Sequence, residues 1–202
     1  MTDKKMTVAS VQGKDLSKDF RVERLDVAGL AQAGGHLHGS DALKKFPRLL
    51  QEVSGDAGLL GVSTLVEWWA QGDQAKSAEG TAGTPQVWLH LQAHAQVPQV
   101  CQRCLADVDL SLEVDRSYRF VADEATAEAQ DDESEEDVLA LSREFNLLEL
   151  IEDELLMALP LVPRHEVCPV APKMTVADAE FETQNGEKPN PFAVLQSLKS
   201  KK

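Results

Sequence analysis

The stretch that decides the fold is V-W-L-H-L-Q-A-H-A-Q-V, residues 87–97. Every second residue from Val87 to Val97 is apolar, whereas the residues between them, such as His90 and His94, are mostly polar. A repeat of two places successive side chains on opposite faces of a β-strand. The segment therefore predicts a strand that packs one face on a core and exposes the other face to water.

A second alternating stretch occupies residues 108–121, where Leu112 and Val114 alternate with charged or polar residues. The connection between the two stretches contains Cys101 and Cys104. Consecutive strands joined by a short connection usually lie side by side and pair antiparallel. We therefore predict a β-hairpin whose turn carries both cysteines.

The clearest helix pattern begins after Asn146, which can cap a helix in which Leu147, Ile151 and Leu155 recur every fourth residue. A second helix is predicted from Asn190 onward, where a proline follows the capping residue. The acidic residues of the first helix are expected to form a solvated face: Glu149, Glu152, Asp153 and Glu154.

The remaining elements have weaker patterns. Strands are expected at 20–27, 59–69 and 138–141, a helix at 41–53, and a loop at 33–40. Strands followed by helices indicate an α+β fold. We expect an antiparallel β-sheet with a cysteine-bearing hairpin, packed by an acidic amphipathic helix and a C-terminal helix.

A chain of 202 residues with 43% hydrophobic residues suits one domain with extensions. We expect a flexible tail at residues 1–19 and a single domain at 20–202. Mobile loops are expected near 71–84, which is rich in small residues, and near 123–137, which is strongly acidic.

The formal net charge of −14 argues against non-specific nucleic-acid binding, because a phosphate backbone repels such a chain, and it favours basic partners. No apolar signal segment opens the sequence, and no apolar run is long enough to cross a membrane. We expect a cytoplasmic protein that does not bind membranes. The odd number of cysteines, 3, argues against a disulfide framework.

Cys101-Gln-Arg-Cys104 has the spacing with which two thiolates bind one metal ion. His165 and Cys168 lie close together further along the chain and complete a Cys₃His set for a structural zinc, provided that the chain folds back onto the hairpin turn. Reduced thiols in a turn explain the same pattern. Two alternatives therefore remain: a structural zinc site, or reduced cysteines without a cofactor. Redox chemistry is less favoured, since redox pairs usually begin a helix after a strand.

The other histidines are weaker candidates for a site. His36 and His38 are expected in a glycine-containing loop with no acidic or thiol partner nearby. His90 and His94 lie four residues apart on a strand, about 13 Å, which is too far to chelate one ion. No phosphate-binding loop, nucleophile elbow or metalloprotease motif occurs, so no catalytic residue and no small-molecule substrate are predicted.

Three stretches occur in a distinctive order: C-Q-R-C-L at 101–105, E-D-E-L-L-M-A-L-P-L-V-P at 152–163, and K-P-N-P-F-A-V-L-Q-S-L-K at 188–199. In these stretches the chain resembles the YceD-type family of bacterial large ribosomal RNA subunit accumulation proteins. The resemblance implies a non-catalytic ribosome-biogenesis factor that supports synthesis, processing or stability of large-subunit (23S) ribosomal RNA.

The partner implied by the resemblance is a large-subunit ribosomal precursor or a ribosomal protein, with direct RNA contact left open. An alternative from the net charge is an acidic adaptor or chaperone for a basic ribosomal protein. A third class, a nuclease or RNA-modifying enzyme, would need an open position on the metal.

Overall fold

The computed structural model describes residues 13–75, 86–132, 134–171 and 176. The chain divides into two compact units, Met1–Glu166 and Val167–Lys202. Among the described residues of the second unit there is no helix or strand, and the helix predicted from Asn190 lies outside the described residues. Within the described ranges, no helix is long and apolar enough to span a bilayer.

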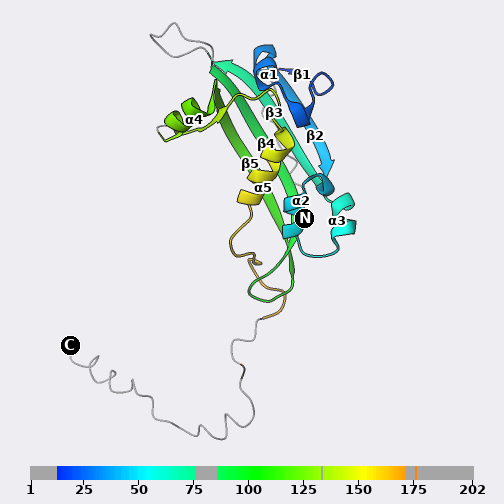
Figure 1. Cartoon of the computed structure of the whole chain (residues 1–202). Helices are drawn as coiled ribbons and strands as arrows, with labels where there is room; N and C mark the ends of the chain where they lie inside the picture. The colour runs from blue at the N-terminus through cyan, green and yellow to red at the C-terminus, as the bar shows by residue number, and fades with distance from the viewer. Residues whose placement is uncertain (1–12, 76–85, 133, 172–175, 177–202) are drawn as a thin grey trace, which may run out of the picture. The chain divides into compact units, whose positions relative to one another are not determined.

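A mixed β-sheet organises the first unit (Figure 1). The described residues contribute six strands in the order in which they occur along the chain. β1 pairs parallel with β2, and β5 pairs parallel with β6, whereas the inner pairs are antiparallel. The strands are β1 (Lys14–Asp15), β2 (Gly35–Ala42), β3 (Leu65–Ala75), β4 (Gln86–Val100), β5 (Asp107–Val121) and β6 (Asp137–Ala140). The α+β class is confirmed, but a purely antiparallel sheet is wrong.

The described residues also form five α-helices and two 3₁₀ turns. The α-helices are α1 (Val27–Ala33), α2 (Pro47–Glu52), α3 (Ala57–Ser63), α4 (Glu124–Asp131) and α5 (Leu147–Met157), and two 3₁₀ turns are η1 (Val22–Arg24) and η2 (Leu43–Lys45). α1 packs on β3 and β4, and α5 packs on β4 and β5. At Gly72 of β3 the backbone of α1 comes so close that an added Cβ would lie 2.7 Å from the Ala31 nitrogen.

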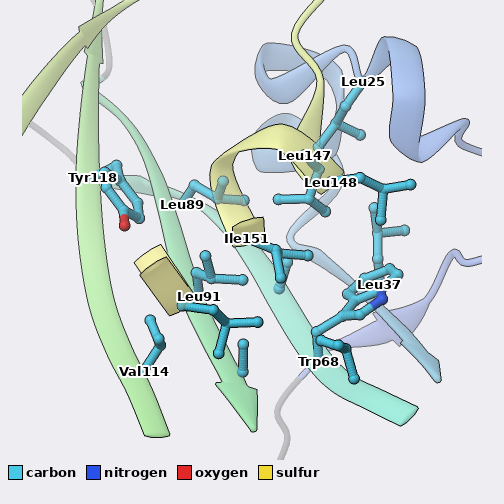
Figure 2. Close-up of a cluster of buried hydrophobic side chains, with 14 of the residues drawn as sticks. Leu25, Leu37, Trp68, Leu89, Leu91, Val114, Tyr118, Leu147, Leu148 and Ile151 are labelled. Atoms are coloured by element: carbon cyan, nitrogen blue, oxygen red, sulfur yellow. The ribbon is translucent and has the colours of Figure 1, made fainter. Parts of the chain in front are cut away.

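The core lies between these helices and one face of the sheet. Leu89 and Leu91 of β4 are fully buried and point to the same side as the buried residues of β3 and β5. Figure 2 shows Leu147 and Ile151 of α5 among these strand residues. The alternation of residues 87–97 therefore has the predicted consequence, since its apolar side chains meet the apolar stripe of α5.

The opposite face of the sheet carries polar side chains, and we call it the open face. Cross-strand pairs on it join His38 to Trp69, Trp69 to Gln92, and Gln92 to Asp115. Their side chains are exposed or partly exposed. The open face thus runs across β2 to β5.

Two predictions near the N-terminus are wrong. The strand expected at 20–27 is replaced by η1 and the start of α1, which Asp26 caps by accepting a hydrogen bond from the Gly29 N–H at 3.0 Å. The loop expected at 33–40 is largely β2, which begins at Gly35. Pairing with β3 overrides the weak strand propensity of its glycines and histidines.

Further differences concern boundaries and the acidic segment. The helix expected at 41–53 divides into η2 and α2, because Pro47 can begin a helix but cannot continue one. The strand expected at 59–69 begins only at Leu65, after α3. Residues 71–75 extend β3, so the loop expected near 71–84 is wrong there. Within 123–137, residues 124–131 form α4 rather than a loop, capped by Asp123.

Candidate metal centre at the hairpin tip

The turn between β4 and β5, which we call the tip, holds Cys101 and Cys104 in a defined backbone geometry. The Cys101 N–H donates to the Ala106 carbonyl at 2.9 Å, and the Leu105 N–H donates to the Cys101 carbonyl at 2.8 Å. Leu105 has a φ of 60°, in the left-handed region. That conformation costs a non-glycine residue about 1–2 kcal/mol, and such strain is typical of functional turns.

The segment after α5 folds back onto the tip, as the sequence requires for a shared site. The Gln102 N–H donates to the Pro163 carbonyl at 2.8 Å. The guanidinium of Arg103 donates to the carbonyls of His165 at 2.9 Å and Glu166 at 3.2 Å. Each of these contacts is accepted by a backbone carbonyl of the segment after α5, and together they place His165 beside the cysteines.

Cys101, Cys104 and His165 form a compact donor set within the first unit. Each offers one ligand atom, and these atoms lie within 4.8 Å of one another. The Cys104 Sγ and His165 Nδ1 atoms are 3.5 Å apart. Tetrahedral zinc with bonds of about 2.0–2.3 Å keeps its ligand atoms roughly 3.4–3.8 Å apart. Small side-chain adjustments would therefore bring the three atoms onto one ion.

Cys168 belongs to the second unit and follows His165 by three residues. Three residues of chain span at most about 10 Å, so Cys168 is within reach of an ion bound by His165. The structure thus brings three of the four predicted members, Cys101, Cys104 and His165, together within the first unit.

The Cys101 thiol is suited to metal binding by its surroundings. Burial raises the pKa of this thiol, but hydrogen bonds from the backbone of Cys104, His165 and Arg103 oppose burial and lower the pKa to about 5. At neutral pH the sulfur is therefore a thiolate, which is the form that binds metal ions.

The acidic residues of α5 differ from the prediction. Glu152 and Glu154 are only 4% and 6% exposed, so the solvated face expected for them is wrong. Glu152 accepts hydrogen bonds from the backbone N–H groups of Arg48 at 2.6 Å and Leu49 at 3.2 Å, and from the Arg48 side chain at 3.0 Å. It therefore caps the first turn of α2, which has no side-chain cap from its own N-cap residue.

Glu154 is the second buried carboxylate of α5 that pairs with an arginine. It accepts from Arg116 of β5 at 3.3 Å, and Arg116 also lies 3.4 Å from Asp137 of β6. Burial raises the pKa of the neighbouring Tyr118 phenol, and the Glu154 carboxylate raises it further. No pattern within α5 could reveal these partners, because both arginines lie in distant segments.

The remaining histidines lie on or beside the open face. His90 is 3.0 Å from the Ser117 hydroxyl and His94 is 3.1 Å from the Ser111 hydroxyl. His36 and His38 lie on β2, not in a loop. The expectation that they lack an acidic partner is wrong, since Asp15 of β1 lies 3.8 Å from His38.

Comparison with known proteins identifies the family. Residues 89–199, which include the tip, α5 and the four candidate ligands, match the family described as large ribosomal RNA subunit accumulation protein YceD. A protein of that name from Haemophilus influenzae is 39% identical over 103 residues, which cover 50% of this chain and 59% of the relative. No solved structure matches the chain. Because the family match covers more than half of this chain, the protein belongs to the YceD family.

Proposed function

We propose that this protein is a non-catalytic ribosome-biogenesis factor of the cytoplasm that supports synthesis, processing or stability of large-subunit (23S) ribosomal RNA. The observation that carries the proposal is the family match over residues 89–199. The matched relative is named for accumulation of that RNA subunit, but the chain spans only 59% of its length. The activity and the partners of the whole protein are therefore part of the proposal.

The tip provides the contact surface for a large-subunit precursor in this proposal. Leu105 in the tip, and Leu161 and Val162 in the segment after α5, are exposed at 75%, 102% and 58%. Beside them lies a pocket of about 370 Å³ lined by Glu52, Gln99, Gln102 and residues 159–163. Apolar groups that are exposed together on a rigid frame are typical of interaction sites.

A structural zinc at Cys101, Cys104, His165 and Cys168 belongs to the same proposal. The donor geometry and the lowered pKa of Cys101 support it. Three thiolates and one imidazole form a closed set of the kind that holds zinc for structure rather than catalysis. The ion would fix the segment after α5 against the hairpin and so hold the contact surface in one arrangement.

The experiment is to replace the chromosomal gene with one that encodes Leu161→Asp. Because Leu161 is fully exposed, the fold should persist while the proposed contact is lost. The ratio of large- to small-subunit RNA should fall toward the level of a deletion strain. Leu59→Asp on α3, 65% exposed, is the matched control and should leave the ratio unchanged.

The results separate two failures. Normal large-subunit RNA in the deletion strain would overturn the proposed function itself. A deletion defect that Leu161→Asp does not reproduce would reject the tip as the contact surface while the function stands.

The second candidate, an acidic adaptor for a basic ribosomal protein, is favoured by the charge of the open face. Cross-strand pairing aligns carboxylates from β3 and β5 on this face: Glu67, Asp73, Asp109, Glu113 and Asp115. An escort bound by charge alone should release its partner in a pull-down at physiological salt or above, because the Debye length then falls to about 8 Å or less. A precursor-bound factor should instead co-sediment with large-subunit particles at that salt.

A further inference from the structure

A second group of metal-ligand side chains lies at the β1 edge of the sheet. Asp15 of β1 is paired with His36 of β2, and His38 lies two residues further along β2. Alternate residues of a strand project from the same face, so both imidazoles lie on the side of Trp69. One ligand atom from each of Asp15, His36 and His38 lies within 4.8 Å of the others.

The surroundings of His36 point to a ligand. Its Nδ1 atom is buried and has no hydrogen-bond partner within the described part of the chain. Its ring stacks on Trp69, with centroids 6.1 Å apart and planes inclined by 28°, which limits how the imidazole can turn. A buried imidazole nitrogen without a partner is costly, and coordination by the ring fixes its tautomer and orientation.

The other two side chains can adjust to an ion. The side chains of His38 and Asp15 are 58% and 54% exposed, so they can rotate with little loss of packing. The Asp15 carboxylate accepts a hydrogen bond from the Ser17 N–H at 3.0 Å, and contacts with Ser17 lower the pKa of this carboxyl. Asp15 is therefore anionic at neutral pH, as a metal ligand must be.

We propose that Asp15, His36 and His38 form a second metal site, which binds a divalent transition-metal ion of the zinc, cobalt and nickel class. Two imidazoles and a carboxylate suit these ions, and three protein ligands leave coordination positions for water. The site lacks sulfur and is open to solvent, so its ligand chemistry differs from that of the cysteine set. This inference goes beyond the proposed function and does not depend on it.

The test is a Co²⁺ titration of the full-length, untagged protein under reducing conditions. Co²⁺ at the cysteine set produces thiolate-to-cobalt absorption bands. Co²⁺ at the second site should quench Trp69 fluorescence, because His36 stacks on that indole. We expect two equivalents per chain, of which one quenches fluorescence without adding thiolate bands.

Variants assign the quenching equivalent. His38→Gln and Asp15→Asn should each weaken it by roughly tenfold or more, while the thiolate bands stay unchanged. Asp15→Asn keeps an oxygen that can accept from Ser17, so it also guards against loss of local structure. Trp69→Phe should abolish the quench but leave the calorimetric stoichiometry at two.

His90→Gln is the matched control. His90 also contacts Trp69, with centroids 5.9 Å apart, but it faces Ser117 and Asp115 and cannot reach the Asp15 group. Its replacement should leave the titration unchanged. Absence of any equivalent that quenches tryptophan fluorescence in the unaltered protein, or equal weakening of that equivalent by His90→Gln and His38→Gln, would overturn the second site.

Discussion

The two ends of the β4–β5 hairpin are stabilised in different ways. Where α5 packs, which we call the base, Leu89, Leu91 and Ile151 are fully buried and Glu154 is paired with Arg116. The tip has no comparable apolar core. It is held by hydrogen bonds to backbone carbonyls, and it carries the side chains of the candidate metal site. Local stability follows buried contacts, so the tip can open while the base stays folded. The difference separates the part that maintains the fold from the part that can respond to a ligand.

The largest effect is expected at the base, from Glu152→Ala. The change leaves the Arg48 side chain and the first turn of α2 without their acceptor. Each lost hydrogen bond to this buried, charged acceptor costs about 1.5–3 kcal/mol, and two of the donors are backbone N–H groups. Urea unfolding followed by tryptophan fluorescence measures the loss.

Asp153→Asn is the control for Glu152→Ala. Asp153 contacts the same arginine at 2.5 Å, but both side chains are about half exposed. An exposed pair contributes less than about 1 kcal/mol. Similar losses from both variants would show that the buried geometry of Glu152 has no special role.

A second effect at the base is expected from Ile151→Ala. Ile151 is fully buried in the core between α5 and the sheet (Figure 2). Removal of its side chain should cost about 2–5 kcal/mol, whereas Ile151→Val should cost about 0.5–1.5 kcal/mol. Equal costs for the two replacements, measured by the same urea unfolding, would contradict tight packing at this position.

A smaller and local effect is expected from removal of metal at the tip. Cys104→Ser should abolish about one bound zinc per chain, measured by elemental mass spectrometry. Hydrogen exchange at the Gln102 and Leu105 amides should then accelerate by roughly tenfold, while amides of β4 beneath α5 stay protected. If metal removal unfolds the base as well, the two ends are not separate.

The smallest effect is expected from Leu105→Gly, and its sign is opposite. Glycine adopts the left-handed φ of 60° without strain, and the lost side chain is 75% exposed. We expect a gain of up to about 1 kcal/mol, reduced by the greater freedom of glycine in the unfolded chain. Leu161→Gly, at an exposed position without a positive φ, should give no gain in thermal unfolding.

The sequence predicts the hairpin and α5 well because their signals are local. The alternation at 87–97 predicts a strand and the face that it buries. The apolar residue at every fourth position from Leu147 to Leu159 does the same for the helix. The position of Cys101 and Cys104 in the turn was also predictable, since both lie between the two alternating stretches.

The failures concern features that depend on distant segments. β2 is a strand because β3 pairs with it, although its own glycines and histidines favour a loop. Glu152 is buried because Arg48 lies across from it, and Asp15 meets His36 only through a parallel pairing. None of these contacts leaves a periodic pattern in the segment itself, so local reasoning assigns each residue to solvent.

The lengths of the outer strands have a consequence for association between chains. β4 and β5, with 15 residues each, lie in the middle of the sheet, whereas β1 and β6 at its two edges have 2 and 4 residues. A long, flat edge strand is a template onto which another chain can add a strand and aggregate. β6 pairs with β5 only at Tyr118–Val121, so within the described residues the stretch 107–117 of β5 has no strand partner on that side. An incoming strand can therefore pair with the sheet along this stretch of β5 rather than at the short strands β1 and β6.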